Sequence, residues 1–462
     1  MALDIRPQPK PNKGVSIFYE GSDAIIDEYT KLLEFSDNLE CLANWFLRYS
    51  VRPQPGIILA AIISTCSILM GRGICLFGKK ANVYTLVISG TSTGKNAVFT
   101  LSKNIIRACG CDHVIGADSI ASGEGLIKEL SIKPEIIWPL DEIQDMIKNV
   151  GGAKASSYAV NISKYLKTMY SGNADFKERV LGSDKEPDKA PLGELYPVIL
   201  SAAQPLSFWA NANRTMVADG FIPRFLAFTG DEEVLIDSNQ LMAMHLAPHS
   251  FTEMPKKIID QMKLWTHRKV DQSLMELANV PGQVPSIRCA GSHEAFVLLQ
   301  QTLTDFDFAI RTLYKEDQTM AELVGKNTEY LVKCALISAW IRSPASAYLI
   351  EDDVRWAARV VKVSNTLMRD GFLRYNVVND FERNVAAVLS ALADAPNGLT
   401  KDKLSKRLRG VSSYNIDQLL VKATEMGDVT VSAGMPDENG RRIRVYHHNQ
   451  HVEESIDQEL LA

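Results

Sequence analysis

The sequence has almost no excess of charge of either sign and no regular arrangement of cysteines. Among 462 residues, 50 are Lys or Arg and 55 are Asp or Glu, which gives a formal net charge of −5. This balance provides no overall attraction to nucleic acid, so any DNA contact must come from local basic patches.

The seven cysteines are scattered and odd in number, which excludes a secreted disulfide framework and indicates reduced thiols in a cytosolic setting. Cys109, Cys111 and His113 lack a second nearby pair to complete a tetrahedral metal site, so we interpret the cysteines as small core residues.

Hydrophobic runs of membrane-spanning length and an N-terminal signal core are also missing. The most apolar stretch, IILAAIISTCSILM at 57–70, is shorter than the roughly 20 residues of a membrane helix, so we expect a buried helix and no membrane partner. The polar, proline-rich RPQPKPNK at 6–13 is interpreted as part of a flexible tail over residues 1–18 rather than as a targeting peptide.

The first half of the chain shows two patterns. Hydrophobic residues make up 46% of the sequence, enough for several buried cores at this length. Residues 19–78 have apolar side chains at three- and four-residue spacing, which predicts a helical N-terminal region, expected to serve oligomerisation. Between 79 and 235, short apolar runs (YTLVIS, EIIWPL, YPVILSA and RFLAFTG) alternate with longer amphipathic stretches. This alternation predicts an α/β fold whose parallel sheet is covered by helices on both faces.

The second half shows two further patterns. Residues 236–378 are mostly helical by period and predict a helical lid region. Residues 379–449 contain three short helical segments and then two strand-like runs across the DENG turn at 437–440, which is the order of a winged helix. The acidic, polar residues 450–462 predict a disordered tail.

A glycine-rich turn between a predicted strand and a predicted helix is the most informative feature. In a P-loop, glycines let the backbone wrap around phosphate oxygens, the following helix offers free N–H groups, and a lysine bridges the terminal phosphates. SGTSTGKNA at 89–97 has this arrangement and predicts ATP binding, with a glycine-rich turn in an unrelated α/β protein as the alternative. The predicted nucleotide-binding residues are Ser89, Gly90, Thr91, Ser92, Thr93, Gly94, Lys95, Asn96 and Ala97.

Two positions depart from the usual P-loop pattern. Ser89 stands where the first glycine is expected, and Asn96 stands where Ser or Thr would bind Mg²⁺. An amide oxygen is a hard, neutral ligand that can still meet Mg²⁺, directly or through water. We therefore expect Asn96 to be a tolerated variant that forms the Mg²⁺ site together with Asp141.

An acidic pair follows the second apolar run. A hydrolysing P-loop needs one carboxylate for the Mg²⁺ shell and another that orients or deprotonates the attacking water. EIIWPLDE at 135–142 supplies Asp141 for the metal and Glu142 for the water; an exposed acidic pair at a strand end is the alternative. Pro139 is awkward inside this strand because proline lacks the N–H that a sheet ladder uses.

Two more polar residues complete the predicted catalytic set. Gln204 ends the third apolar run, where its side chain can touch the γ-phosphate or the attacking water. Arg224 precedes the last apolar run and is the first choice for an arginine finger that completes a neighbouring subunit's site, with Arg214 as the second. For both arginines an ordinary surface role is the alternative. The predicted catalytic residues are Lys95, Asp141, Glu142, Gln204 and Arg224.

Taken in order, SGTSTGKN, ASGEGLIKEL, IIWPLDE, LSAAQP and DGFIPRFL resemble the P-loop ATPases of phage, plasmid and satellite replication proteins of the primase/helicase type. The TSTGKN loop is also similar to that of superfamily 3 helicases of small DNA viruses. This resemblance covers residues 20–375 and implies an AAA+-like ring, commonly hexameric, with nucleotide between subunits and single-stranded DNA in the channel. It implies the bacterial host cytoplasm as the location, and it matches the five catalytic residues to the phosphate lysine, metal acid, catalytic acid, sensor and arginine finger.

DNA contacts are expected in two places. Superfamily 3 motors carry a DNA-contacting hairpin between the acidic strand and the sensor strand. The corresponding interval here holds four basic residues among acidic ones. A solvated loop of mixed charge, without DNA contact, is the alternative. In the winged-helix unit, KDKLSKRLRG at 401–410 and the wing are basic, which predicts phosphate contacts. The third helix is only weakly basic, so protein docking stays open. The predicted DNA-binding residues are Lys177, Arg179, Lys185, Lys189, Lys406, Arg407, Arg409, Arg441 and Arg442.

Together these features predict an ATP- and Mg²⁺-dependent hexameric ring helicase or translocase that replicates a phage or mobile element. It would move on single-stranded or forked DNA and meet a replication initiator, primase or polymerase as partner. The alternative is an ATP-binding initiator, helicase loader or regulator that assembles on DNA without unwinding it. A small-molecule kinase is disfavoured because nothing resembles a substrate lid and the winged helix would be unexplained.

Overall fold

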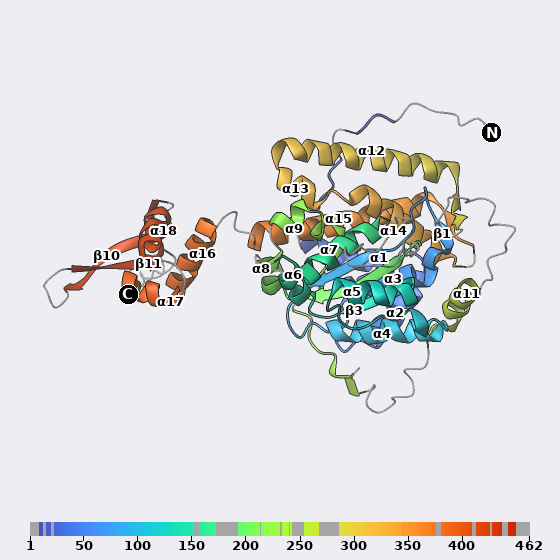
Figure 1. The fold of residues 1–462 in the computed structure, drawn as a ribbon, viewed down its shortest axis with the longest axis horizontal. Coiled ribbons are helices and arrows are strands. Elements are labelled where there is room, and N and C mark those ends of the chain that lie inside the picture. The colour runs from blue at the N-terminus through green and yellow to red at the C-terminus, as the bar shows by residue number, and fades with distance from the viewer. Residues whose placement is uncertain are drawn as a thin grey trace, which may run out of the picture. The chain divides into compact units, whose positions relative to one another are not determined.

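The protein divides into two compact units, Met1–Phe372 and Leu373–Ala462. The computed structural model (Figure 1) describes residues 9–12, 15–19, 23–151, 157–171, 193–212, 214–231, 233–239, 241–242, 254–267, 286–344, 346–375, 380–408, 413–425, 427–436 and 442–449. The predicted N-terminal region, ATPase core and lid region all belong to the first unit. The second unit begins close to the predicted winged-helix start at residue 379.

A parallel sheet forms the centre of the first unit. Its strands are β2 (Tyr84–Ile88), β3 (Glu135–Leu140), β4 (Tyr196–Ala203) and β5 (Phe225–Phe228), in the spatial order β3-β4-β2-β5. Each neighbouring pair is parallel. The strands are buried almost throughout, as expected for continuously apolar runs with cover on both faces. The predicted α/β fold with a parallel sheet is confirmed.

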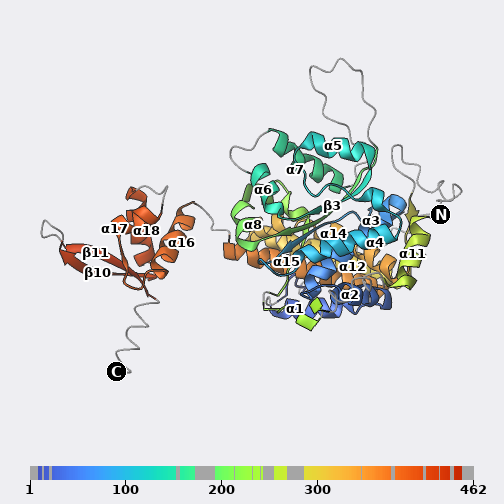
Figure 2. The same ribbon diagram turned by 90° about the horizontal axis from the view of Figure 1, so that it is seen from below.

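Helices cover this sheet on both faces. One face packs against α3 (Pro55–Met70), which contacts β2, β3, β4 and β5 and also α4 (Lys95–Ala108). Two further helices, α6 (Ile143–Gly151) and α7 (Ser157–Tyr170), also pack against the sheet, at β4. Figure 2 shows β3 between the layer of α5 (Gly123–Ile132) and α7 and the layer of α3 and α4.

The helix α3 is buried along its length. Every residue from Gly56 to Met70 is buried, because the sheet, α4 and α14 (Asn327–Arg342) surround it. By length and composition, residues Pro55–Gly73 would pass for a membrane span, but 89% of that window is buried inside the fold. The apolar run therefore serves as the core helix of the sheet layer, as predicted.

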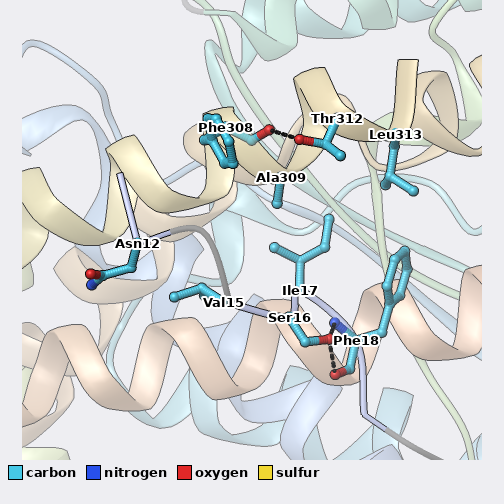
Figure 3. Close-up of a pocket in the computed structure, with 9 residues that line it drawn as sticks. All are labelled: Asn12, Val15, Ser16, Ile17, Phe18, Phe308, Ala309, Thr312 and Leu313. Carbon is cyan, nitrogen blue, oxygen red and sulfur yellow. Dashed lines mark hydrogen bonds between the residues drawn. The ribbon is translucent and has the colours of Figure 1, made fainter. Parts of the chain in front are cut away.

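The described part of the predicted flexible tail is docked on helices. Ile17 is buried, and the Asn12 N–H donates to the Asp305 carboxylate at 2.8 Å. A cavity of about 210 Å³ lies between this segment and α12 (His293–Glu316), and Figure 3 shows the mostly apolar side chains that line it. Residues 9–12 and 15–18 thus differ from the prediction for 1–18, because hydrogen bonds from Asn12 and to the Lys10 carbonyl join them to α12 and the Ile17 side chain is buried.

The region predicted as a helical lid shares the core of the sheet. It contains α12 and α14 together with α11 (Lys256–Thr266), α13 (Gln318–Leu323) and α15 (Glu351–Tyr375). α14 is buried almost throughout and packs against α3. One short parallel pair, β1 (Ile74–Cys75) with β6 (Ile287–Arg288), links this region to the N-terminal region. A second pair, β7 (Ala290–Gly291) with β8 (Tyr348–Leu349), lies within it.

The second unit has the expected order of three helices and two strands. Its elements are α16 (Asp380–Ala393), β9 (Leu399–Thr400), α17 (Lys401–Arg407), α18 (Ser413–Glu425), β10 (Val429–Pro436) and β11 (Arg442–His448). β10 and β11 form an antiparallel hairpin, and the unpredicted short strand β9 adds to its edge. Apolar residues of all three helices, among them Val388, Leu404 and Ile416, form a core of their own.

Candidate functional site

Three predicted site segments begin where neighbouring strands end. Because the strands are parallel, the residues after β2, β3 and β4 emerge at the same edge of the sheet. Ile88 pairs with Ala203, so the glycine-rich loop and Gln204 leave adjacent strands at the same level. Asp141 follows β3 on the far side of β4. Ligands of open α/β sheets bind at this carboxyl edge.

The loop conformation suits close approach of a backbone to a ligand. Gly94 has a φ of 86° at the N-cap of α4, a left-handed conformation that glycine adopts without steric cost. Ser92 has a φ of 64°, which is uncommon for a residue with a side chain and is found more often at functional sites. The buried Thr93 hydroxyl donates to the Gly90 carbonyl at 3.1 Å and so closes the turn.

Lys95 is the first residue of α4 and points back into the loop. Its ammonium donates to the Ser89 carbonyl at 2.8 Å and to the Ala203 carbonyl at 3.4 Å, which ties the loop to the end of β4. Burial lowers the pKa of Lys95, and the nearby carboxylates of Asp141 and Glu142 oppose this shift. The structure therefore brings the predicted lysine within the field of both predicted acids.

Asp141 and Glu142 are exposed at the end of β3. Glu142 has a φ of 53°, so the turn after β3 is held in a sparsely populated conformation. One Asp141 carboxylate oxygen accepts the Glu142 N–H at 3.0 Å. Both carboxylates are accessible to a ligand at the sheet edge.

Pro139 fits β3 because of the side that its nitrogen faces. The Ile137 carbonyl accepts the Gly116 N–H at 2.9 Å, and Ile137 bridges Ile115 on the side away from β4. Alternate residues of a strand direct their backbone groups to opposite neighbours, so Pro139 faces the same outer side as Ile137. Its missing N–H therefore breaks no bond to β4.

The oxygen ligands predicted for Mg²⁺ are both accessible. Asn96 is exposed on the first turn of α4, and Asp141 is exposed after β3. An amide oxygen and a carboxylate oxygen are hard donors of the kind that Mg²⁺ takes alongside phosphate oxygens and water. Within the described part of the chain, the buried Ser89 hydroxyl at the base of the loop has no hydrogen-bond partner. These features fit a Mg²⁺–nucleotide ligand. Among the described residues, no three His, Cys, Asp or Glu side chains form a protein-only metal cluster.

Gln204 and Arg224 lie at opposite edges of the sheet. Gln204 is half-buried at the N-cap of α8 (Pro205–Asn211), and its side chain does not cap the helix. Arg224 comes just before β5, at the amino edge, where it donates to the Gly220 carbonyl and lies 5.8 Å from the centre of the Tyr170 ring. The structure thus brings Gln204 to the loop but not Arg224. Arg214 belongs to α9 (Arg214–Ala218), with its side chain outside the described residues.

The predicted DNA-binding residues are described only in part. Lys406 and Arg407 are exposed on α17, and Arg407 also donates to the Ala391 carbonyl at 3.2 Å. Arg442 is described only as backbone of β11. The other six predicted residues lie outside the described part of the chain: Lys177, Arg179, Lys185, Lys189, Arg409 and Arg441.

Sequence reasoning missed the turn between α2 (Asp37–Arg48) and α3 as part of the site. Gln54 in this turn is buried and exchanges two hydrogen bonds with the Asp231 backbone after β5, at 2.7 and 2.8 Å. Arg52 packs beside Gly94. The proline-rich RPQPG signal marked a turn, but no local pattern could show which distant segment the turn would contact.

Cys109 and Cys111 are buried and His113 is exposed. Burial raises the pKa of the Cys109 thiol to about 12, which keeps it protonated and a poor metal ligand. The interpretation of these two cysteines as core residues agrees with their burial.

Comparison with known proteins finds no matching family model and no matching curated protein.

Proposed function

We propose that the protein is a DNA-dependent ATPase of mobile-element or phage replication, acting as a ring helicase or translocase on single-stranded or forked DNA. The observation that carries this proposal is the shared edge of β2, β3 and β4. A phosphate-binding type of loop, two exposed carboxylates and a polar residue follow these strands in order. The electrostatic influence of Asp141 and Glu142 on Lys95 supports their action as one site.

In this proposal each side chain has a distinct task. Loop N–H groups and Lys95 bind the phosphates of ATP, as the N-terminus of α4 favours an anion. Asn96 and Asp141 would hold Mg²⁺, which when bound neutralises charge on the phosphates. Glu142 orients or deprotonates the attacking water. Gln204 stands at the end of β4 to contact the γ-phosphate or that water.

The position of Arg224 supports the proposed assembly into a ring. Arg224 is at the amino edge of the sheet, away from its own loop. It can act as a finger only on the site of a neighbouring subunit, which is the arrangement of a homo-hexamer with nucleotide between subunits. To do so its guanidinium would have to leave Gly220 and the Tyr170 ring.

The second unit is proposed as a winged helix that grips or recruits DNA. Its helix and strand order and the exposed cations Lys406 and Arg407 support this role. DNA binding through such cations would rest mainly on phosphate contacts.

The experiment that tests the proposal is steady-state ATP hydrolysis with and without single-stranded DNA, beside forked-duplex unwinding. We expect turnover that rises several-fold with DNA and is lost in Lys95→Ala. Glu142→Gln should bind ATP but neither hydrolyse it nor unwind the fork. Unwinding that persists in both variants would refute the motor.

A second candidate is an ATP-binding initiator, helicase loader or regulator that assembles on DNA without unwinding it. Asn96 in place of a Mg²⁺-binding hydroxyl, and the engagement of an Asp141 oxygen by the Glu142 N–H, favour binding without fast turnover. Size-exclusion chromatography with ATP, followed by fork unwinding, separates the two. ATP-dependent assembly with no strand separation supports this second candidate.

A further inference from the structure

The turn between α2 and α3 touches the glycine-rich loop at the start of α4. A methyl group added at Gly94 would lie 3.2 Å from the Arg52 Cβ and 3.4 Å from the Arg52 carbonyl oxygen. Gly94 is the N-cap of α4, where N–H groups of the loop and helix are free to meet an anion. The backbone and Cβ of Arg52 therefore stand beside the part of the loop that would receive phosphate, within side-chain reach of it.

Hydrogen bonds to the segment after β5 fix the position of Arg52. Two residues along, the buried Gln54 carboxamide donates to the Asp231 carbonyl at 2.7 Å and accepts the Asp231 N–H at 2.8 Å. The Arg52 guanidinium itself donates through Nη1 to the Val234 carbonyl at 3.0 Å. The turn is thus held at both of these residues rather than only packed against the loop.

The charge of Arg52 has no counter-charge in the described part of the chain. No described carboxylate pairs with it; its partner there is the neutral carbonyl of Val234. A guanidinium has five N–H donors, so one bond leaves most of them for a ligand. The side chain is half-exposed, and arginine matches phosphate geometry better than any other side chain.

The proposed Mg²⁺ offsets the two carboxylates of the site, and a triphosphate still leaves room for a second side-chain cation. Lys95 faces the two carboxylates Asp141 and Glu142, so these three side chains together do not attract a polyanion. Building on the function proposed above, we propose that Arg52 binds the phosphates of the bound nucleoside triphosphate, as a second cation beside Lys95. The turn 51–54 would then belong to the nucleotide site.

Binding of a fluorescent ATP analogue to the full chain, followed by anisotropy, tests this assignment. We expect Arg52→Gln to weaken binding about tenfold or more, the effect of losing a charge-assisted hydrogen bond. Arg52→Lys keeps the charge and should retain most of the affinity. Glutamine is too short to reach the Val234 carbonyl that Arg52 Nη1 meets at 3.0 Å, so the unfolding midpoint without nucleotide is measured beside binding to separate a structural role from a phosphate contact. Arg48→Gln removes the same charge from an exposed position on α2 and should leave binding unchanged.

The outcomes distinguish this assignment from the proposed ATPase. Thermal unfolding without nucleotide should change little in Arg52→Gln, because the two Gln54 bonds to Asp231 still hold the turn; the loss of binding should exceed the loss of stability. If Lys95→Ala loses binding but Arg52→Gln binds within about twofold of wild type, the role of Arg52 is overturned and the ATP site stands. Equal losses in Arg52→Gln and Arg52→Lys would also overturn it, because charge would then not matter. If wild type binds no nucleotide, the proposed function fails and this assignment fails with it.

Discussion

Asn96 is exposed on the first turn of α4, at the position where a P-loop places a Mg²⁺-binding hydroxyl. Its amide oxygen is one atom farther from the backbone than a hydroxyl would be, so its contact with the metal is less well fixed. We expect Asn96→Thr to lower the Mg²⁺ concentration that gives half-maximal ATP hydrolysis, and Asn96→Ala to raise it. A Mg²⁺ titration of hydrolysis checks this. Identical titration curves for the three proteins would show that residue 96 does not touch the metal.

Lys333 is a buried cation at the amino edge of the sheet. Its ammonium donates to the Asn82 carbonyl at 2.7 Å and the Tyr170 carbonyl at 3.0 Å, and it lies 3.4 Å from the centre of the Tyr170 ring. These contacts join α14 to α7 and to the start of β2. Burial nonetheless lowers the pKa of Lys333 to about 7, because the charged form is poorly solvated there.

The lowered pKa makes folding stability depend on pH. Between about pH 7 and the usual lysine value near 10.4, the unfolded chain binds more protons than the folded one, so the free energy of unfolding rises with pH. We expect wild type to gain stability relative to Lys333→Met over this window, by up to about 1.4 kcal/mol per pH unit. Urea unfolding of both proteins at several pH values measures the difference. Parallel profiles would mean that Lys333 does not titrate in this range.

At the scale of elements, the segment after β5 and the turn before α3 meet with little spare room. A methyl group at Gly230 would lie 2.9 Å from the Ile57 Cδ1, 3.0 Å from the Gln54 Oε1 and 3.1 Å from the Ser89 Oγ. We expect Gly230→Ala to destabilise the fold by about 1–3 kcal/mol, as overpacking does, and to weaken ATP binding by displacing the base of the loop. Denaturant unfolding and nucleotide binding measure the two effects.

The matched control for this substitution is Gly73→Ala. A methyl group there meets only the Trp265 Cζ2 at 3.4 Å, an ordinary van der Waals contact. Its effect on stability and on ATP binding should therefore be small. Equal effects of the two substitutions would show that the contact between Gln54 and the segment after β5 does not support the loop.

The sequence predicted the strands well because their signal is local. β2, β3, β4 and β5 are continuously apolar runs, a pattern typical of buried parallel strands. Their carboxyl ends also predicted that Lys95, Asp141 and Gln204 would share one edge. The spatial order β3-β4-β2-β5 was not predicted, since order depends on which helices pack together and not on the period of any one run.

The parts that were missed depend on contacts between distant residues. Arg52 meets the loop, and Gln54 meets Asp231, 177 residues away in sequence, so neither contact leaves a periodic pattern. The docking of Ile17 was missed for a similar reason: a proline-rich, polar segment predicts a mobile tail. Its few apolar side chains become buried only because α12 and α15 provide a surface for them.

At the scale of the whole molecule, the two units have separate cores and separate charge patterns. In the second unit, the face of α18 has little free positive charge, because Asp417 pairs with Lys401 at 2.5 Å and Glu425 lies 3.7 Å from Lys422. Groove insertion by α18 would therefore gain little from phosphate attraction. The exposed Lys406 and Arg407 on α17 are the better candidates for backbone contacts.

This charge pattern predicts how DNA binding by the full chain responds to salt. Each phosphate contact adds about 0.9 to the slope of log affinity against log salt for duplex DNA, so Lys406→Gln with Arg407→Gln should reduce the slope by up to about 2. Lys422→Gln is the matched control on α18 and should change the slope little, because its charge is already opposed by Glu425. Fluorescence anisotropy with a forked duplex at several salt concentrations measures the slopes. If the double variant keeps the wild-type slope and affinity while ATP hydrolysis still responds to DNA, then DNA contact belongs to the first unit. The second unit would then be a protein-docking module, since its basic helix would have no phosphate to neutralise.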